Sequence, residues 1–168
     1  MHILTCLGTA TAAVVVVISP AATFGIAGAA AQGGTTVVMD SYERRCDFSK
    51  VTEAAWIPQP PEGTGSALIS TSGSTAVAQV HMAIPNEPAT HYDVGLIEEP
   101  RPSSATCGPG APGTAFIGMD TDAAGNATVT VQDSIRQGTT GVWVIIERAN
   151  PNSQNPAEFY TSEFLVPV

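Results

Sequence analysis

The chain has 168 residues, of which 15 are acidic and 6 are basic, and its formal net charge is −9. Nucleic acids and anionic lipid surfaces attract proteins that carry basic patches. The charge therefore argues against both as partners, and it is sufficient to keep an exported domain soluble.

An uncharged segment opens the chain. Residues 3–31 hold no charged side chain, contain the apolar run "AAVVVVISP" and end in Ala29-Ala30-Ala31. An apolar run followed by small residues at an A-x-A position is typical of a secretory signal peptide. We therefore expect a signal peptide over 1–31, cleavage near Ala31, and a single domain over 32–168 that is secreted or associated with the cell envelope. The alternative is an uncleaved segment, which would be the protein's only membrane contact.

Two cysteines remain after that cleavage, because Cys6 leaves with the segment. Cys46 and Cys107 have no CxxC or similar metal-binding spacing around them. A single pair of cysteines in an oxidising compartment predicts a disulfide bond.

Short runs rich in Val, Ile, Thr, Phe and Tyr follow one another through the rest of the chain, separated by Gly, Pro, Ser and Asn. This pattern is typical of an all-β fold, and seven or eight such strands fit an antiparallel, immunoglobulin-like β-sandwich. Residues 142–146 are apolar at both odd and even positions. This predicts a central strand that is covered on both faces, with Trp143 in a core. The segment 51–57 is ambiguous and could hold one helical turn. Strands are predicted near 35–42, 66–71, 75–84, 90–98, 114–119, 127–133, 141–148 and 158–166.

Three connections have recognisable turn chemistry. "DAAGNA" (122–127) offers Gly125 and Asn126 for positive φ between two strands. The overlapping stretch "DTDAAGNAT" (120–128) is similar to a calcium-binding loop, but the match fails because its fifth position, Ala124, and its twelfth, Val131, lack oxygen ligands. "EEPRPSSATCGPGAPG" (98–113) is a long Pro/Gly loop, and "ANPNSQNPAE" (149–158) is a polar loop.

Both histidines of the predicted domain lie in "AVAQVHMAIPNEPATHYDVGLI" (76–97). The alternation of apolar residues places His81 on the outer face of one strand and His91 and Asp93 on the outer face of the next. If these strands pair, the three side chains lie within cross-strand reach of one another. Two histidines and a carboxylate can bind zinc or copper with one position open for water. An exposed polar face without a metal is the simpler interpretation, because no close ligand pair is present.

Nucleophilic catalysis has no support in the sequence. No G-x-S-x-G motif is present, and the two cysteines are expected to be bonded to each other. Glu98 and Glu99 are adjacent in a predicted strand, so they point to opposite faces and do not form a catalytic pair. We therefore expect no enzymatic activity.

The segments "AIPNEPATHYDVGLIEEPRPSSATCG", "TDAAGNATVTV", "GVWVIIER" and "EFYTSEFLV" carry a resemblance that covers most of the domain. They resemble a family of small exported actinobacterial, mycobacterial-type proteins. The "TDxxGN" hairpin is also similar to bacterial immunoglobulin-like and chordin-repeat-like modules. The resemblance implies a secreted β-sandwich, and it supplies no catalytic residues.

We predict a non-enzymatic binding module for an unknown protein or envelope component. Its binding loops would be 99–113 and 149–158, with Arg101, Asn150 and Asn152 as candidate contacts. One alternative is a metal-binding protein or metal-dependent enzyme that uses the two histidines and Asp93. The other is a passive structural surface protein, and neither it nor the binding module requires a cofactor.

Overall fold

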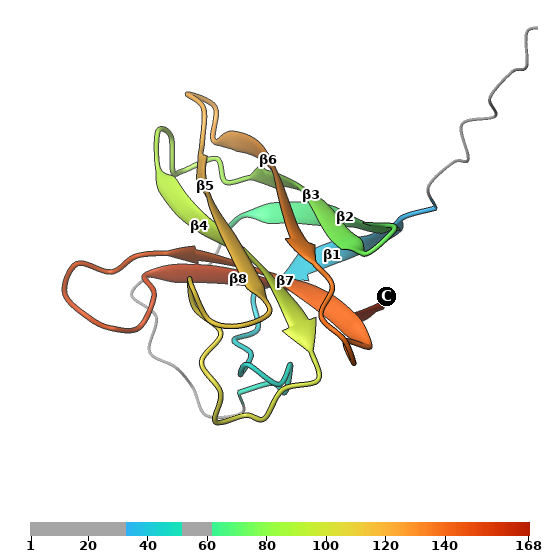
Figure 1. Cartoon of the computed structure of the whole chain (residues 1–168). Coiled ribbons are helices and arrows are strands. Elements are labelled where there is room, and N and C mark those ends of the chain that lie inside the picture. The colour runs from blue at the N-terminus through green and yellow to red at the C-terminus, as the bar shows by residue number, and fades with distance from the viewer. Residues whose placement is uncertain (1–32, 52–61) are drawn as a thin grey trace, which may run out of the picture. The chain divides into compact units, whose positions relative to one another are not determined.

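The computed structural model describes residues 33–51 and 62–168 (Figure 1). The predicted signal peptide and most of the ambiguous segment 51–57 lie outside these residues. The described residues form strands and no helix, so none of them builds a helix able to cross a membrane. The strands are β1 (Thr35–Asp40), β2 (Thr64–Ser72), β3 (Thr75–Ala83), β4 (His91–Glu99), β5 (Thr114–Asp120), β6 (Asn126–Ser134), β7 (Gly141–Arg148), β8 (Glu158–Ser162) and β9 (Val166–Pro167).

The strands form one antiparallel sheet in the order β5-β4-β7-β8-β1-β2-β3-β6, and β9 pairs with β7. Strand β1 joins the two halves of this sheet. Its residues up to Val38 pair with β2, and Met39 and Asp40 then pair with β8. The outermost strands β5 and β6 pack against each other without a hydrogen-bonded ladder, so the sheet is nearly closed.

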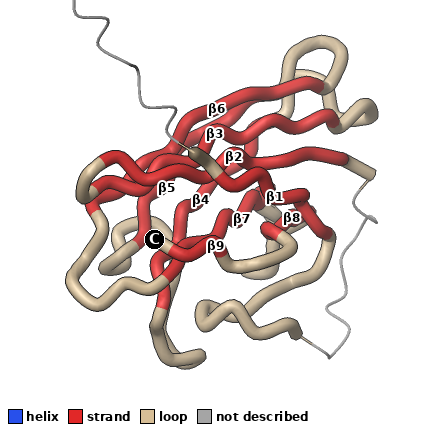
Figure 2. The backbone as a smooth tube through the Cα atoms, turned by 90° about the vertical axis from the view of Figure 1, so that its right-hand side faces the viewer, coloured by secondary structure: helices blue, strands red, loops and turns tan. Residues whose placement is uncertain are grey.

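The two halves of the sheet enclose a hydrophobic core. Figures 1 and 2 show β2, β3 and β6 on one side of the molecule, with β4, β7 and β8 across from them. Several strands contribute every second residue to this core, as period-two alternation requires. The even residues of β3 illustrate the pattern, since Ala76, Ala78, Val80 and Met82 are all buried. Tyr92, Val94 and Leu96 reach the same core from β4.

Strand β7 is covered on both faces, as the sequence predicts. Val142, Val144 and Ile146 belong to the main core. Trp143 and Ile145 point the other way and form a second apolar cluster with Ile97 of β4, Phe48, Cys107, Phe116 and Leu165. This second cluster lies on the outer face of the β4–β7 half, beneath the segment that precedes residue 52.

All eight predicted strands are present, and two details differ from the prediction. The last predicted strand is interrupted, because β8 ends at Ser162 and the chain resumes as β9 only at Val166. In the 122–127 turn only Gly125 has positive φ, at 79°, while Asn126 begins β6. A side chain at Gly125 would collide with the Ile84 carbonyl, so this turn requires glycine.

Candidate functional site

The structure separates the three residues of the predicted metal site, and the predicted pairing of their strands is wrong. β3 pairs with β2 and β6, whereas β4 pairs with β5 and β7. His81 therefore lies on the outer face of one half of the sheet, and His91 and Asp93 lie on the outer face of the other. In the ranges 33–51 and 62–168, no group of three or more His, Cys, Asp or Glu residues is placed to hold a metal ion.

His91 lies between two carboxylates at the exposed end of β4. Its Nδ1 is 2.8 Å from Oδ1 of Asp120, and its Nε2 is 3.7 Å from Oδ1 of Asp93. The hydrogen bond with Asp120 raises the pKa of the imidazole above its usual value. Asp93 also faces Glu147 across the β4–β7 pair, where burial and the nearby carboxylates raise the pKa of Glu147.

His81 lies in a different setting. Its Nδ1 is 3.0 Å from the hydroxyl oxygen of Thr128, and it faces Ser66 on the other neighbouring strand. These residues line an open hollow of about 340 Å³ over the ends of β2, β3 and β6. Its lining carries hydroxyl and amide groups and no charged side chain.

The two predicted binding loops leave the molecule from opposite ends of the β4–β7 pair. Glu99 at the end of β4 faces Gly141 at the start of β7, because the two strands are antiparallel. The loop that follows β4 and the loop that follows β7 therefore cannot form one continuous binding surface (Figure 1). In the second loop, Asn150 accepts a hydrogen bond from the N–H of Asn152, which closes a local turn.

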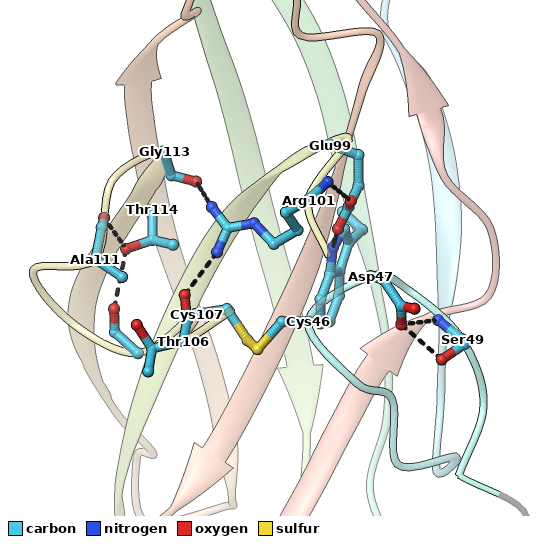
Figure 3. The surroundings of a disulfide bond; sticks show 12 residues. Cys46, Asp47, Ser49, Glu99, Arg101, Thr106, Cys107, Ala111, Gly113 and Thr114 are labelled. Atoms are coloured by element: carbon cyan, nitrogen blue, oxygen red, sulfur yellow. Dashed lines mark hydrogen bonds between the residues drawn. A yellow bond between two sulfur atoms is a disulfide. The ribbon is translucent and has the colours of Figure 1, made fainter. Parts of the chain in front are cut away.

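The predicted disulfide bond between Cys46 and Cys107 is present. It joins the segment 41–51 to the 99–113 loop (Figure 3). Phe48 packs on Trp143 with ring centroids 5.6 Å apart, which seats the disulfide over the second apolar cluster. The bond therefore fixes a loop that has no regular secondary structure of its own.

Arg101 organises the same loop from within. Its guanidinium donates to the backbone carbonyls of Glu98, Thr106, Pro112 and Gly113 at 2.7–3.1 Å. These bonds use four of its five N–H groups, so this candidate contact residue mainly holds its loop together, as Figure 3 shows for Thr106 and Gly113.

Arg136, in the β6–β7 connection, is fixed along only one side. Its Nε donates to Oε2 of Glu98 at 2.7 Å, and its guanidinium lies against Gly113, where an added Cβ would collide with it. Glu98 is fully buried and also accepts from the Thr139 hydroxyl at 2.8 Å. The two terminal nitrogens of Arg136 have no partner among the described residues, and 42% of the side chain is exposed.

These two arginines line an open pocket of about 330 Å³ beside the disulfide-bonded loop. Pro100, Pro102 and Pro112 supply apolar, rigid walls. The pocket therefore combines the guanidinium of Arg136, whose terminal nitrogens have no partner among the described residues, with an apolar surface.

The basic residues of this acidic chain belong, with one exception, to three segments. Every basic residue except Arg148 belongs to the segment 41–51, the 99–113 loop or the β6–β7 connection. Glu99, the acidic residue next to Glu98, is held by Trp143 and by the Arg101 N–H. Burial raises the pKa of its carboxyl group above the usual value.

Sequence reasoning found the disulfide but missed Arg136, Glu98 and Asp120 as interacting groups, and its assignment of Arg101 as a binding contact stays a prediction. The ion pair between Glu98 and Arg136 joins residues that are far apart in the sequence, and no local motif marks it. A glutamate pair in an otherwise apolar strand was the one available signal, because a buried carboxylate requires a partner.

Comparison of the chain with protein-family models, with curated proteins and with solved structures finds no match. The functional argument therefore depends on the geometry of the chain itself.

Proposed function

We propose that the protein is a secreted or cell-envelope-associated, non-enzymatic binding module that recognises a carboxylate group on a protein or envelope component. The binding site is the pocket of Arg136, Arg101 and the three prolines. The single observation that carries the proposal is the Arg136 guanidinium, which is anchored through Nε while neither terminal nitrogen has a partner within residues 33–51 and 62–168. A planar guanidinium held in this way is preorganised to donate two parallel hydrogen bonds to a carboxylate.

The fold supports a binding role. Strands β2, β3 and β6 lie on one side and β5, β4, β7 and β8 on the other, a division that fits the proposed immunoglobulin-like sandwich. Loops at the ends of such sandwiches are common recognition sites. The disulfide supports an oxidising, extracytoplasmic location, because such bonds persist there.

The ligand class follows from the two kinds of surface in the pocket. The proline walls favour an apolar group next to the carboxylate, and the pocket volume of about 330 Å³ suits one amino-acid-sized group. N-acetyl-phenylalanine has both features, and N-acetyl-phenylalaninamide is the matched probe without the charge.

Isothermal titration calorimetry with these two probes tests the proposal. We expect the carboxylate to bind at least about tenfold more tightly than the amide, since a charge-assisted hydrogen bond contributes about 1.5–3 kcal/mol. Arg136→Gln should abolish this preference, and Arg45→Gln, at an exposed cation in the same region, should leave it intact.

Arg136→Lys provides the second variant, because Arg136→Gln leaves the buried Glu98 without its cation. Lysine keeps the charge but cannot bond Glu98 and a carboxylate in one plane. Equal binding of acid and amide, or an unchanged preference in a folded Arg136→Gln protein, would contradict the proposal.

A further inference from the structure

Among the residues that the structure describes, one outer face of the sheet carries no charged side chain. We call it the neutral face and define it as the outward-pointing residues of β2, β3, β6 and the part of β1 that pairs with β2. Each of these residues is exposed or partly exposed. They are Thr36, Val38, Thr64, Ser66, Leu68, Ser70, Ser72, Thr75, Val77, Gln79, His81, Ala83, Asn126, Thr128, Thr130, Gln132 and Ser134.

The two acidic residues of these four strands lie off this face. Asp133 pairs with the buried Ala76 and therefore lies on the inward-facing side of β6. Asp40 follows the last β1–β2 pair and faces Thr161 of β8 instead. The neutral face is thus a continuous surface of hydroxyl, amide and small apolar groups.

The outer face of the other half has the opposite character. Asp93, Asp120 and Glu147 lie together there, around the exposed His91. In a chain with a net charge of −9, contacts between copies through such a surface would bring like charges together. The neutral face allows two copies to meet without that repulsion.

The neutral face also contains exposed apolar groups. Val38 is 57% exposed and Leu68 is 37% exposed, and they are diagonal neighbours on β1 and β2. Around them the side chains are short, so two such faces can approach closely. Hydroxyl and amide groups can both donate and accept, which lets identical surfaces satisfy each other's hydrogen bonds.

We propose that the neutral face binds a second copy of this chain, giving a symmetric dimer in which the two sheets pack face to face. Strands spaced by about 4.8 Å and about nine residues long give roughly 600 Å² per copy, so the dimer would bury about 1,200 Å². That area is at the lower end for a specific interface and predicts a reversible dimer. The acidic faces of the two copies would lie about 30 Å apart, well beyond the Debye length of about 8 Å.

Sedimentation equilibrium of the purified chain tests this proposal. We expect a monomer–dimer equilibrium with a Kd between about 1 μM and 1 mM at physiological salt. Added salt should leave the dimer intact, because the acidic faces already lie beyond the Debye length and the interface itself contains no ion pairs to screen. A monomer throughout this concentration range would overturn the proposal.

Two glutamine residues provide matched variants. Gln79 lies in the middle of the neutral face, between Leu68 and Thr130, and Gln154 is exposed in the loop after β7. Gln79→Glu should weaken the dimer at least about tenfold, and Gln154→Glu, with the same change in net charge, should not.

Lysine substitutions at the same two positions distinguish an effect of the neutral face from an effect of the net charge. Gln79→Lys should also weaken the dimer, although it lowers the net negative charge. Equal effects of the Gln79 and Gln154 variants would overturn the proposal, and so would a dimer that Gln79→Lys strengthens. Retention of a monomeric chain on an uncharged polysaccharide, lost in Gln79→Glu, would assign the face to a glycan instead.

Discussion

His91 is held between Asp120 and Asp93, and the Asp120 hydrogen bond is the main reason that its pKa is raised. A histidine whose pKa is higher in the folded state stabilises that state fully below its unfolded pKa of about 6.5. The contribution is lost as the pH rises through the folded-state pKa.

An NMR titration of the His91 imidazole measures this shift directly. We expect Asp120→Asn to lower the His91 pKa toward its usual value, and Asp93→Asn, which removes the longer contact, to lower it less. The reverse order would show that the Asp120 hydrogen bond is not the dominant cause.

Glu147 lies near carboxylates of its own charge, whereas His91 lies near carboxylates of the opposite charge. Burial raises the pKa of this carboxyl group, and Asp93 and Glu43 raise it further. Because the folded-state pKa is above the unfolded one, ionised Glu147 destabilises the fold at neutral pH, and this penalty disappears as the pH falls below about 4.5.

Glu147→Gln should therefore stabilise the protein at pH 7 by about 0.2–1 kcal/mol, the range for a like-charge cross-strand pair. The gain should shrink in acid. Urea unfolding at pH 7 and pH 4 measures both values, and a variant that is less stable than the parent at pH 7 would contradict this account.

The 99–113 loop is the element that shapes the proposed binding pocket. Arg101 holds it through four backbone carbonyls, a set of bonds that lysine cannot reproduce. We expect Arg101→Lys to lower the free energy of unfolding by about 1–3 kcal/mol, since several carbonyls lose their donor. Arg45→Lys, at an exposed position, is the control and should change it little.

The disulfide is the second restraint on this loop. Cys46 and Cys107 are 61 residues apart, and closing a loop of that length contributes about 4 kcal/mol on the chain-entropy model. The double variant Cys46→Ser/Cys107→Ser should lose stability of that order in urea unfolding. A loss below about 1 kcal/mol would mean that packing around Phe48 and Trp143 already fixes the segment.

The strands could be predicted because period-two alternation is local, and β3 and β4 have it clearly. Which strands pair is a non-local property, and there the prediction was wrong. The carbonyl of Gly125 accepts a hydrogen bond from the Ile84 N–H, and the Thr121 N–H donates to the carbonyl of Thr90. The backbone groups with which a β3–β4 hairpin would begin are therefore already used, and the connection crosses between the two halves of the sheet.

The candidate site was only partly predictable for the same reason. The disulfide could be predicted from the number of cysteines, and the 99–113 loop could be predicted from its proline and glycine residues. Arg136 reaches the pocket only because the fold brings the β6–β7 connection beside the end of β4. No local pattern in "DSIRQGTT" indicates that its neighbour is the buried Glu98.

At the scale of the whole molecule, charge is distributed unevenly over the fold. Basic residues other than Arg148 belong to the disulfide-linked segments and the β6–β7 connection, carboxylates surround His91, and the neutral face has neither. Two separate interactions are therefore proposed: a carboxylate in the arginine pocket and a second copy on the neutral face. Their failures are distinguishable, because Arg136→Gln should leave dimerisation unchanged and Gln79→Glu should leave the preference for the carboxylate probe unchanged.

The most direct test of the binding-module account is residue-resolved NMR of the 15N-labelled chain during titration with N-acetyl-phenylalanine. The account predicts amide shifts concentrated in residues 100–113 and 135–139, with an Arg136 side-chain signal that moves with the same Kd. The matched amide probe should produce little change. Shifts around His81 or in the loop 149–157, or no saturable shifts at all, would contradict the assignment of the site.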